Sequence, residues 1–129
     1  MKQALVTGLA LFLPVWLSGC GRTEPTAAGG KPVTYWLSAL HNSDVHARKK
    51  AVQKLGNVGA AEPAVLPALV GMLKDPDSTV RCEAILALTK LGPAAKGAEE
   101  ALSNAKRNDR DARVRGHATK AMAKLRGAN

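Results

Sequence analysis

The feature that most constrains the fold of this chain is a segment that occurs three times. Residues 80–92, with the sequence VRCEAILALTKLG, match residues 47–59 at a spacing of 33 residues and residues 114–126 at a spacing of 34. Each copy follows a triplet that ends in aspartate, namely NSD, DPD and DRD. Because one unit of this size cannot bury its own apolar side, recurrence with a period of about 20 to 50 residues indicates units that stack on one another.

A second, weaker match lies between these copies. The apolar positions of residues 33–40 fall on those of residues 66–73 at the same spacing, and a blurred third copy contains Ala101, Leu102 and Ala105. Each unit therefore contains two helices, and the predicted fold class is all-α: an α-solenoid of about three helix pairs. The expected units are residues 33–59, 62–92 and 94–126, within a repeat domain of residues 32–129.

The repeated segment has the apolar pattern of a packed helix. At about 100° per residue, Val80, Ala84 and Leu88 lie within about 80° of one another on the helix surface. Ala84 is small, which lets neighbouring helices approach closely. Ile85 and Leu86 widen the apolar set, so we expect the middle unit to be covered on more than one side. Aromatic residues make up only 3% of the chain, which suits packed helices better than a β-sandwich.

These residues resemble a known family. Residues 77–92 and 46–59 are similar to the second helix of HEAT-type repeats, in the short bacterial variety that also occurs in phycobilisome lyase subunits. Residues 66–75 are similar to the first helix of that repeat, with Pro67 near the helix start. The resemblance covers about residues 33–126.

The resemblance implies a right-handed stack of antiparallel helix pairs in which certain charged residues are structural. An Asp would cap the second helix of each unit, and an Arg four residues later would pair within or between units. These residues are Asp44, Arg48, Asp77, Arg81, Asp111 and Arg115. The end units depart from the family pattern at Ala47 and Arg126, which stand in place of Val and Gly. Such departures are common where one face of an array meets water.

The first twenty residues are typical of an export signal. A short basic start precedes a mostly apolar run from Ala4 to Leu17, which is shorter than the roughly 18–20 residues of a membrane-spanning helix. The sequence LSGC, which ends at Cys20, resembles the lipobox of bacterial lipoproteins. This resemblance implies a lipoprotein signal peptide at residues 1–19 and acylation of Cys20. An ordinary signal peptide that contains a Cys, and an uncleaved membrane anchor, both stay open.

Acylated Cys20 would anchor the mature chain to a membrane. Residues 20–31 are dominated by Gly, Pro, Thr and Ala, which is typical of a flexible tether that keeps the folded part close to the bilayer. Gly21 is not the Asp that marks inner-membrane retention in enteric-type bacteria. We therefore expect an exported protein on the periplasmic side of either the outer or the cytoplasmic membrane. With Cys20 acylated, Cys82 has no intrachain partner and is better explained as a small helix residue than as a nucleophile.

The charge of the chain predicts acidic partners. Its formal net charge is +9, which favours nucleic acid, anionic membranes or acidic protein surfaces, and export disfavours nucleic acid. A stripe on the last predicted helix, formed by residues spaced 4, 3 and 4 apart, is either a solvated cap or a surface for an acidic partner. Tyr35 is a further candidate because Tyr is favoured at interfaces. The stripe consists of Arg113, His117, Lys120 and Lys124.

Residues that could perform chemistry do not form a convincing site. His41, Asp44 and His46 lie in a predicted turn, and no fourth metal ligand is evident. Glu99 and Glu100 are adjacent, so their side chains diverge on a helix. Nothing in the sequence assembles a nucleophile, a base and an oxyanion site. We therefore expect no enzymatic activity, no metal and no cofactor.

The predicted function is a non-catalytic, lipid-anchored protein-binding scaffold at the bacterial cell envelope. Stacked helix pairs offer an extended surface for this role, and the expected partner is a protein with an acidic surface. Three units are close to the smallest stable array, so self-association also stays open. One alternative is binding of an anionic envelope polymer or membrane surface through the basic last helix. A second alternative is an enzyme subunit resembling the bilin lyases.

Overall fold

A computed structural model of the chain describes residues 30–127, which form six α-helices, three short 3-10 helices and no strand. The expected signal peptide (1–19), Cys20 and most of the expected tether (20–31) lie outside the described residues. The 3-10 helices are η1 (Gly59–Ala61), η2 (Met72–Lys74) and η3 (Gly92–Ala98). The α-helices are α1 (Val33–Ala39), α2 (Val45–Val58), α3 (Val65–Gly71), α4 (Ser78–Leu91), α5 (Glu99–Asn108) and α6 (Ala112–Gly127).

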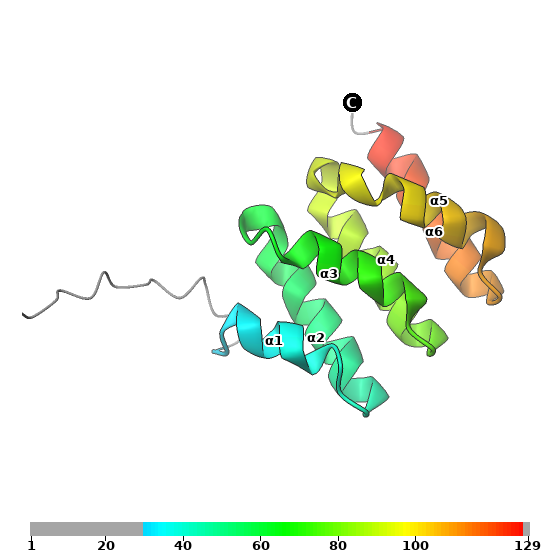
Figure 1. The fold of residues 1–129 in the computed structure, drawn as a ribbon. Helices are drawn as coiled ribbons and strands as arrows, with labels where there is room; N and C mark the ends of the chain where they lie inside the picture. Colours follow the sequence, from blue (N-terminus) through cyan, green and yellow to red (C-terminus); the bar gives the residue numbers. More distant parts are fainter. Residues whose placement is uncertain (1–29, 128–129) are drawn as a thin grey trace, which may run out of the picture.

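The helices form three pairs that stack side by side (Figure 1). Helix α1 packs on α2, α3 on α4, and α5 on α6. Helices α1, α3 and α5 form one layer, called here the first layer, and α2, α4 and α6 form the second layer. The expected all-α solenoid of three helix pairs is confirmed.

Local signals in the sequence set the ends of the long helices. Asp44 and Asp77 cap the first turns of α2 and α4. Each of these helices ends at a glycine with a positive φ angle, +73° at Gly59 and +57° at Gly92. Residues with a Cβ rarely adopt this conformation, so glycine here ends the helix and redirects the chain.

Small residues let the second layer pack more closely than the first. Gly56 of α2 lies so near Ala87 of α4 that a Cβ added to Gly56 would be 2.8 Å from the Ala87 Cβ atom. Ala84 and Ala118 are fully buried at equivalent positions of α4 and α6. Helix α4 packs along both α2 and α6, whereas a groove separates α3 from α5. The second layer is therefore the more closely packed of the two.

The hydrophobic core runs through all three units. Val80, Ala84 and Leu88 are fully buried, as the helical pattern predicted, and Trp36 occupies a buried position in α1. The prediction for Leu86 was wrong, because this side chain is 42% exposed. Leu86 lies on the side of α4 that faces away from the first layer, where no further helix of the described chain covers it.

Within residues 30–127, no helix combines the length and the apolar character needed to cross a bilayer.

Candidate protein-interaction surfaces

The three predicted Asp residues lie at the starts of the second-layer helices. The Asp44 carboxylate accepts the backbone N–H groups of His46 and Ala47, each at 3.2 Å. Asp77 likewise accepts two backbone N–H groups of α4, at 2.8 and 3.2 Å. Asp111 accepts the Arg113 N–H at 2.8 Å. Each carboxylate therefore satisfies N–H groups that a helix start leaves without intrahelical partners.

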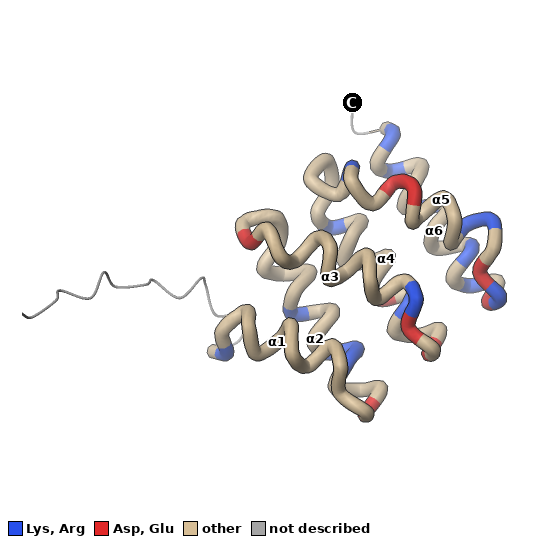
Figure 2. Tube along the Cα trace, viewed as in Figure 1, with Lys and Arg blue, Asp and Glu red and all other residues tan. Residues whose placement is uncertain are grey.

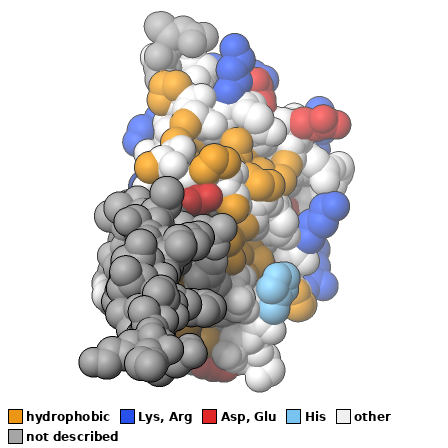
Figure 3. Space-filling model, turned by 60° about the vertical axis from the view of Figure 1, so that its left-hand side comes forward, with side chains coloured by type: hydrophobic (Ala, Val, Ile, Leu, Met, Phe, Trp, Pro, Cys, Tyr) orange, Lys and Arg blue, Asp and Glu red, His pale blue; other side chains and the backbone are white. Residues whose placement is uncertain are grey.

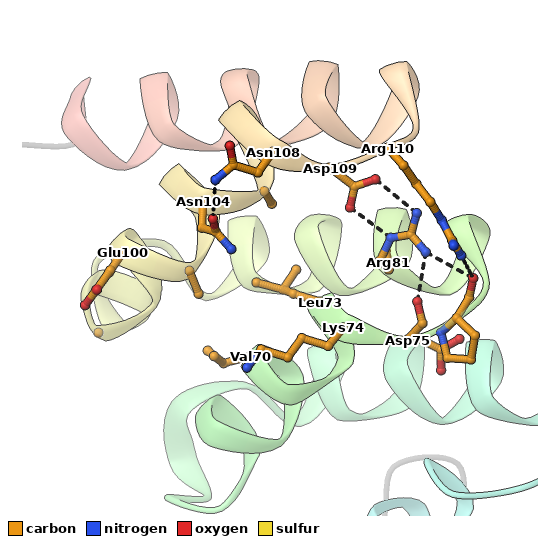
Figure 4. A pocket seen from close by; sticks show the side chains of 14 residues that line it. Val70, Leu73, Lys74, Asp75, Arg81, Glu100, Asn104, Asn108, Asp109 and Arg110 are labelled. Atoms are coloured by element: carbon orange, nitrogen blue, oxygen red, sulfur yellow. Dashed lines mark hydrogen bonds and ion pairs between the residues drawn. The ribbon is translucent and has the colours of Figure 1, made fainter.

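Two predicted Arg residues form a ladder between units. The Arg48 side chain donates through Nε and Nη2 to Asp75 of the next unit, at 2.8 and 3.1 Å. Arg81 repeats this arrangement with Asp109, at 2.9 and 3.0 Å (Figure 4). Figure 2 shows acidic and basic residues close together in the turns that precede α4 and α6. Paired N–H donors on a carboxylate give strong and directional hydrogen bonds, so the ladder fixes the register between neighbouring units.

The acids of the ladder, Asp75 and Asp109, were not singled out in the sequence. Each is the first residue of the triplet whose last residue caps the helix. Each also accepts the N–H of the residue two positions later, at 2.9 Å. The repeat signal that could have identified them is the first position of the triplets, which reads Asn42, Asp75 and Asp109.

The charged groups of the ladder perturb one another. Burial alone would raise the pKa of Asp109, but hydrogen bonds from Arg81 and from the Asp111 N–H outweigh burial and lower it. The hydrogen bond to Asp109 raises the pKa of Arg81. Hydrogen bonds from Arg113 lower the pKa of Asp111 well below its usual range. Both members of the ladder pair therefore stay ionised near neutral pH.

The predicted basic stripe lies on the side of α6 that faces away from the first layer. Arg113 is held in place by Asp111 at 3.0 Å and by the Ser78 hydroxyl at 3.2 Å. His117 is half-buried, and Lys120 and Lys124 are exposed. Two of the four members therefore offer freely exposed positive charge.

Equivalent residues of α2 and α4 extend this stripe into one surface. Contacts between residues 33 to 35 positions apart, such as Lys90 with Asn57 and Arg113 with Ser78, keep the helices of the second layer in register. Leu86 thus occupies the position in α4 that Lys120 occupies in α6. We call this surface the second-layer face. It comprises His46, Lys50, Gln53, Asn57, Thr79, Glu83, Leu86, Lys90, Arg113, His117, Lys120 and Lys124.

Tyr35 does not belong to the second-layer face. It lies on α1, in the first layer and at the opposite end of the array from α6 (Figure 1). Its side chain is 49% exposed, and the Lys31 ammonium lies 5.2 Å from the ring centre. The Trp36 ring meets it edge to face, with ring centres 5.0 Å apart. The structure therefore does not bring the two predicted binding features together.

The first layer offers grooves between its helices. The larger groove, of about 820 Å³, lies between α3 and α5, where Val70, Leu73, Ala101 and Ala105 contribute apolar lining (Figure 4). Polar residues complete the lining, including Lys74, Asn104 and Asn108. A second groove of about 570 Å³ lies between α1 and α3. Figure 3, an oblique view, shows hydrophobic side chains in a band with charged residues mostly along its border.

The described residues offer little for chemistry. No three His, Cys, Asp or Glu side chains of residues 30–127 come together to hold a metal ion. Cys82 is half-buried in α4, and burial raises the pKa of its thiol, which makes it a poorer nucleophile. The Glu100 carboxylate lines the larger groove on the side away from the other two acids of its lining, Asp75 and Asp109 (Figure 4).

The geometry agrees with the family comparison, in which the HEAT repeats match residues 33–123. The match covers most of the chain, which therefore belongs to the HEAT repeat family. Repeats of this family commonly serve as protein-binding scaffolds and are typically non-catalytic. No curated protein matches the chain.

Proposed function

We propose that this protein is a lipid-anchored scaffold at the bacterial cell envelope, and that it binds an acidic protein through its second-layer face. The observation that carries the proposal is the exposure of Leu86. A large aliphatic side chain that is 42% exposed at the centre of the middle helix leaves much of its apolar surface uncovered in the described chain. Apolar side chains surrounded by charged ones are typical of binding surfaces.

The charge around Leu86 defines the kind of partner. Lys90 lies one turn along α4, and Lys120 occupies the equivalent position of α6. The one acid of the second-layer face, Glu83, is already paired with Lys49 at 3.7 Å. The face is therefore strongly positive, which speeds association with an acidic surface, while Leu86 supplies the apolar contact.

Membrane anchoring through Cys20 belongs to the same proposal. Its support is the sequence LSGC together with the apolar run that precedes it. Two or three acyl chains on Cys20 would hold the protein at the bilayer, since each buried CH₂ contributes about 0.8 kcal/mol. The short segment between Cys20 and α1 would place the repeats near the membrane surface.

Site-specific crosslinking in intact cells tests the proposed interface. A photoreactive amino acid at Leu86 should capture one defined protein, identified by mass spectrometry, and capture should survive moderate salt during lysis. The matched control carries the same group at Gly71, an exposed position of α3 with open space around it. The Cys20→Ala chain should leave the membrane fraction and lose capture if the partner is itself membrane-bound. Equal capture from both positions, or none from Leu86, contradicts the proposal.

A second candidate function is binding of an anionic polymer or of lipid headgroups. The observation in its favour is that Lys120 and Lys124 are exposed and have no ion-pair partner among the described residues. Each basic residue near an anionic surface contributes about 1 kcal/mol. This function predicts that vesicles with anionic lipid bind the wild-type chain at low salt. Binding should fall steeply with added salt and disappear when both lysines are changed to Glu. Equally strong binding to neutral vesicles would exclude this second function.

A further inference from the structure

The Arg ladder is complete between units and open at the last unit. Arg48 and Arg81 each use Nη1 to bind a backbone carbonyl of their own unit, at 2.9 and 2.8 Å, and use the Nε–Nη2 edge to bind an Asp of the next unit. Arg115 repeats the first half of this pattern, because its Nη1 donates to the Asp109 carbonyl at 2.7 Å. No carboxylate of residues 30–127 pairs with its Nε–Nη2 edge.

The free edge of Arg115 is held in a defined direction. The Nη1 bond to the Asp109 carbonyl spans six residues, as does the bond from Arg81 to the Asp75 carbonyl, so the two guanidinium groups take equivalent orientations. The Arg81 edge faces the next unit, and the Arg115 edge therefore faces the open end of the array. Because its side chain is half-buried, the group is positioned before any partner arrives, which lowers the entropy lost on binding.

The first unit of the chain argues against one partner for the Arg115 edge, namely a second copy of this chain. The first unit carries Asn42 at the position that Asp75 and Asp109 hold in the later units. The Asn42 side-chain oxygen already accepts the Asp44 N–H at 2.9 Å, and its amide has no second oxygen and no negative charge. A second copy of this chain stacked head to tail would therefore present the Asn42 amide, and not a carboxylate, at the position that faces Arg115.

We infer that the Arg115 edge binds a carboxylate of a different protein, supplied by an Asp in the turn before a helix. Both acids that pair with the ladder in this chain have that setting, since each lies two residues before the Asp that caps α4 or α6. This inference rests on the proposed protein-binding function and places a second contact on another surface, the end of the array.

The surface beside Arg115 suits a reversible contact. Thr119 is exposed in α6 at the position where Val52 and Ile85 are fully buried between units. Ala123 is exposed at the position that Gly56 occupies against α4. The end face thus carries small and mildly polar side chains here, which leaves the Nε–Nη2 edge of Arg115 as its most specific feature.

Crosslinking from Ala123 tests this inference. The chain with a photoreactive amino acid at Ala123 should capture a protein other than a second copy of this chain. The crosslinked residue of that partner should lie within one helical turn of an Asp that precedes a helix. Changing Arg115→Gln should reduce the yield about tenfold, the loss expected for a paired charge-assisted contact. The charge-matched control is Arg107→Gln on the exposed side of α5, which should leave the yield unchanged. A charge swap, in which the partner's Asp is changed to Arg and this chain carries Arg115→Asp, should restore the crosslinking yield from Ala123.

Two further readouts separate recognition from folding. Arg115→Lys keeps one donor for the Asp109 carbonyl but lacks the paired edge, so it should melt like the wild-type protein and still lose the crosslink. No crosslink from Ala123, a crosslink unaffected by Arg115→Gln, or capture of a second copy overturns the inference. If the Leu86 probe still captures its partner in those cases, the proposed function stands while this inference fails.

Discussion

The Arg81–Asp109 ion pair should be the most important single polar contact between units. Its side chains are only 5% and 8% exposed. Arg81 makes four hydrogen bonds, two to the Asp109 carboxylate and two to the carbonyls of Asp75 and Pro76. Replacing Arg81 by Ala should therefore destabilise the fold far more than the loss of a surface pair.

The expected cost follows from what each partner loses. The Asp109 carboxylate keeps the Asp111 N–H as a donor, and the Pro76 carbonyl keeps a bond from Arg110. The lost charged pair contributes about 1.5–3 kcal/mol, and the Asp75 carbonyl left without its donor costs a further ~1 kcal/mol or more. The free energy of unfolding should thus fall by about 3 kcal/mol, close to the range known for breaking buried pairs.

Urea denaturation followed by far-ultraviolet circular dichroism measures this change. The control is Arg126→Ala, because the Arg126–Glu99 pair is 67% and 43% exposed and should contribute at most about 1 kcal/mol. A double-mutant cycle with Asp109→Ala should give a coupling energy above about 1 kcal/mol. A cost for Arg81→Ala no larger than that of Arg126→Ala, or a coupling near zero, would refute the ladder as the link between units.

Further predictions concern packing, pH and the second-layer face. Gly56→Ala should destabilise the fold by about 1–3 kcal/mol, because the new Cβ atom would lie 2.8 Å from the Ala87 Cβ atom of the next helix. The control Gly116→Ala, with open space around it, should instead raise stability by up to about 1 kcal/mol. Equal effects of the two changes in thermal melts would contradict the close packing of α2 on α4. The lowered pKa values of Asp109 and Asp111 mean that their stabilisation is present above the unfolded pKa of about 4 and is lost as the pH falls through the folded values. The urea concentration at the unfolding midpoint should therefore decrease as the pH is lowered below about 4. A midpoint concentration that rises on acidification would contradict this prediction. Leu86→Ser should change stability by less than about 0.5 kcal/mol yet abolish binding of the partner that the Leu86 probe identified, measured with the two purified proteins, whereas a large loss of stability would assign Leu86 a packing role.

The repeat pattern predicted the parts of this structure that depend on local sequence. Val80, Ala84 and Leu88 share one side of a helix whatever lies opposite, and all three are buried. The cap positions of Asp44 and Asp77 follow from their place just before an apolar helix. These properties need only the geometry of one helix and its first turn.

Contacts between units were harder to predict. The Arg48–Asp75 pair joins residues 27 positions apart, and which acid of the DPD triplet faces the Arg depends on the turn geometry. The exposure of Leu86 was missed because a helical pattern shows how wide an apolar side is but not whether a neighbour covers it. The separation of Tyr35 from the basic stripe likewise depends on which layer and which end of the array each residue occupies.

Hydrogen exchange of the partner complex tests the proposed scaffold role most directly. The protein captured from the Leu86 position, mixed with this chain, should slow amide exchange in α4 and α6 and leave α1 and the first-layer helix α3 unchanged. Such protection should weaken as salt is raised and vanish in the Leu86→Ser chain. Protection confined to α3 and α5, around the apolar groove, would show that the partner binds the first layer and would contradict the proposed interface.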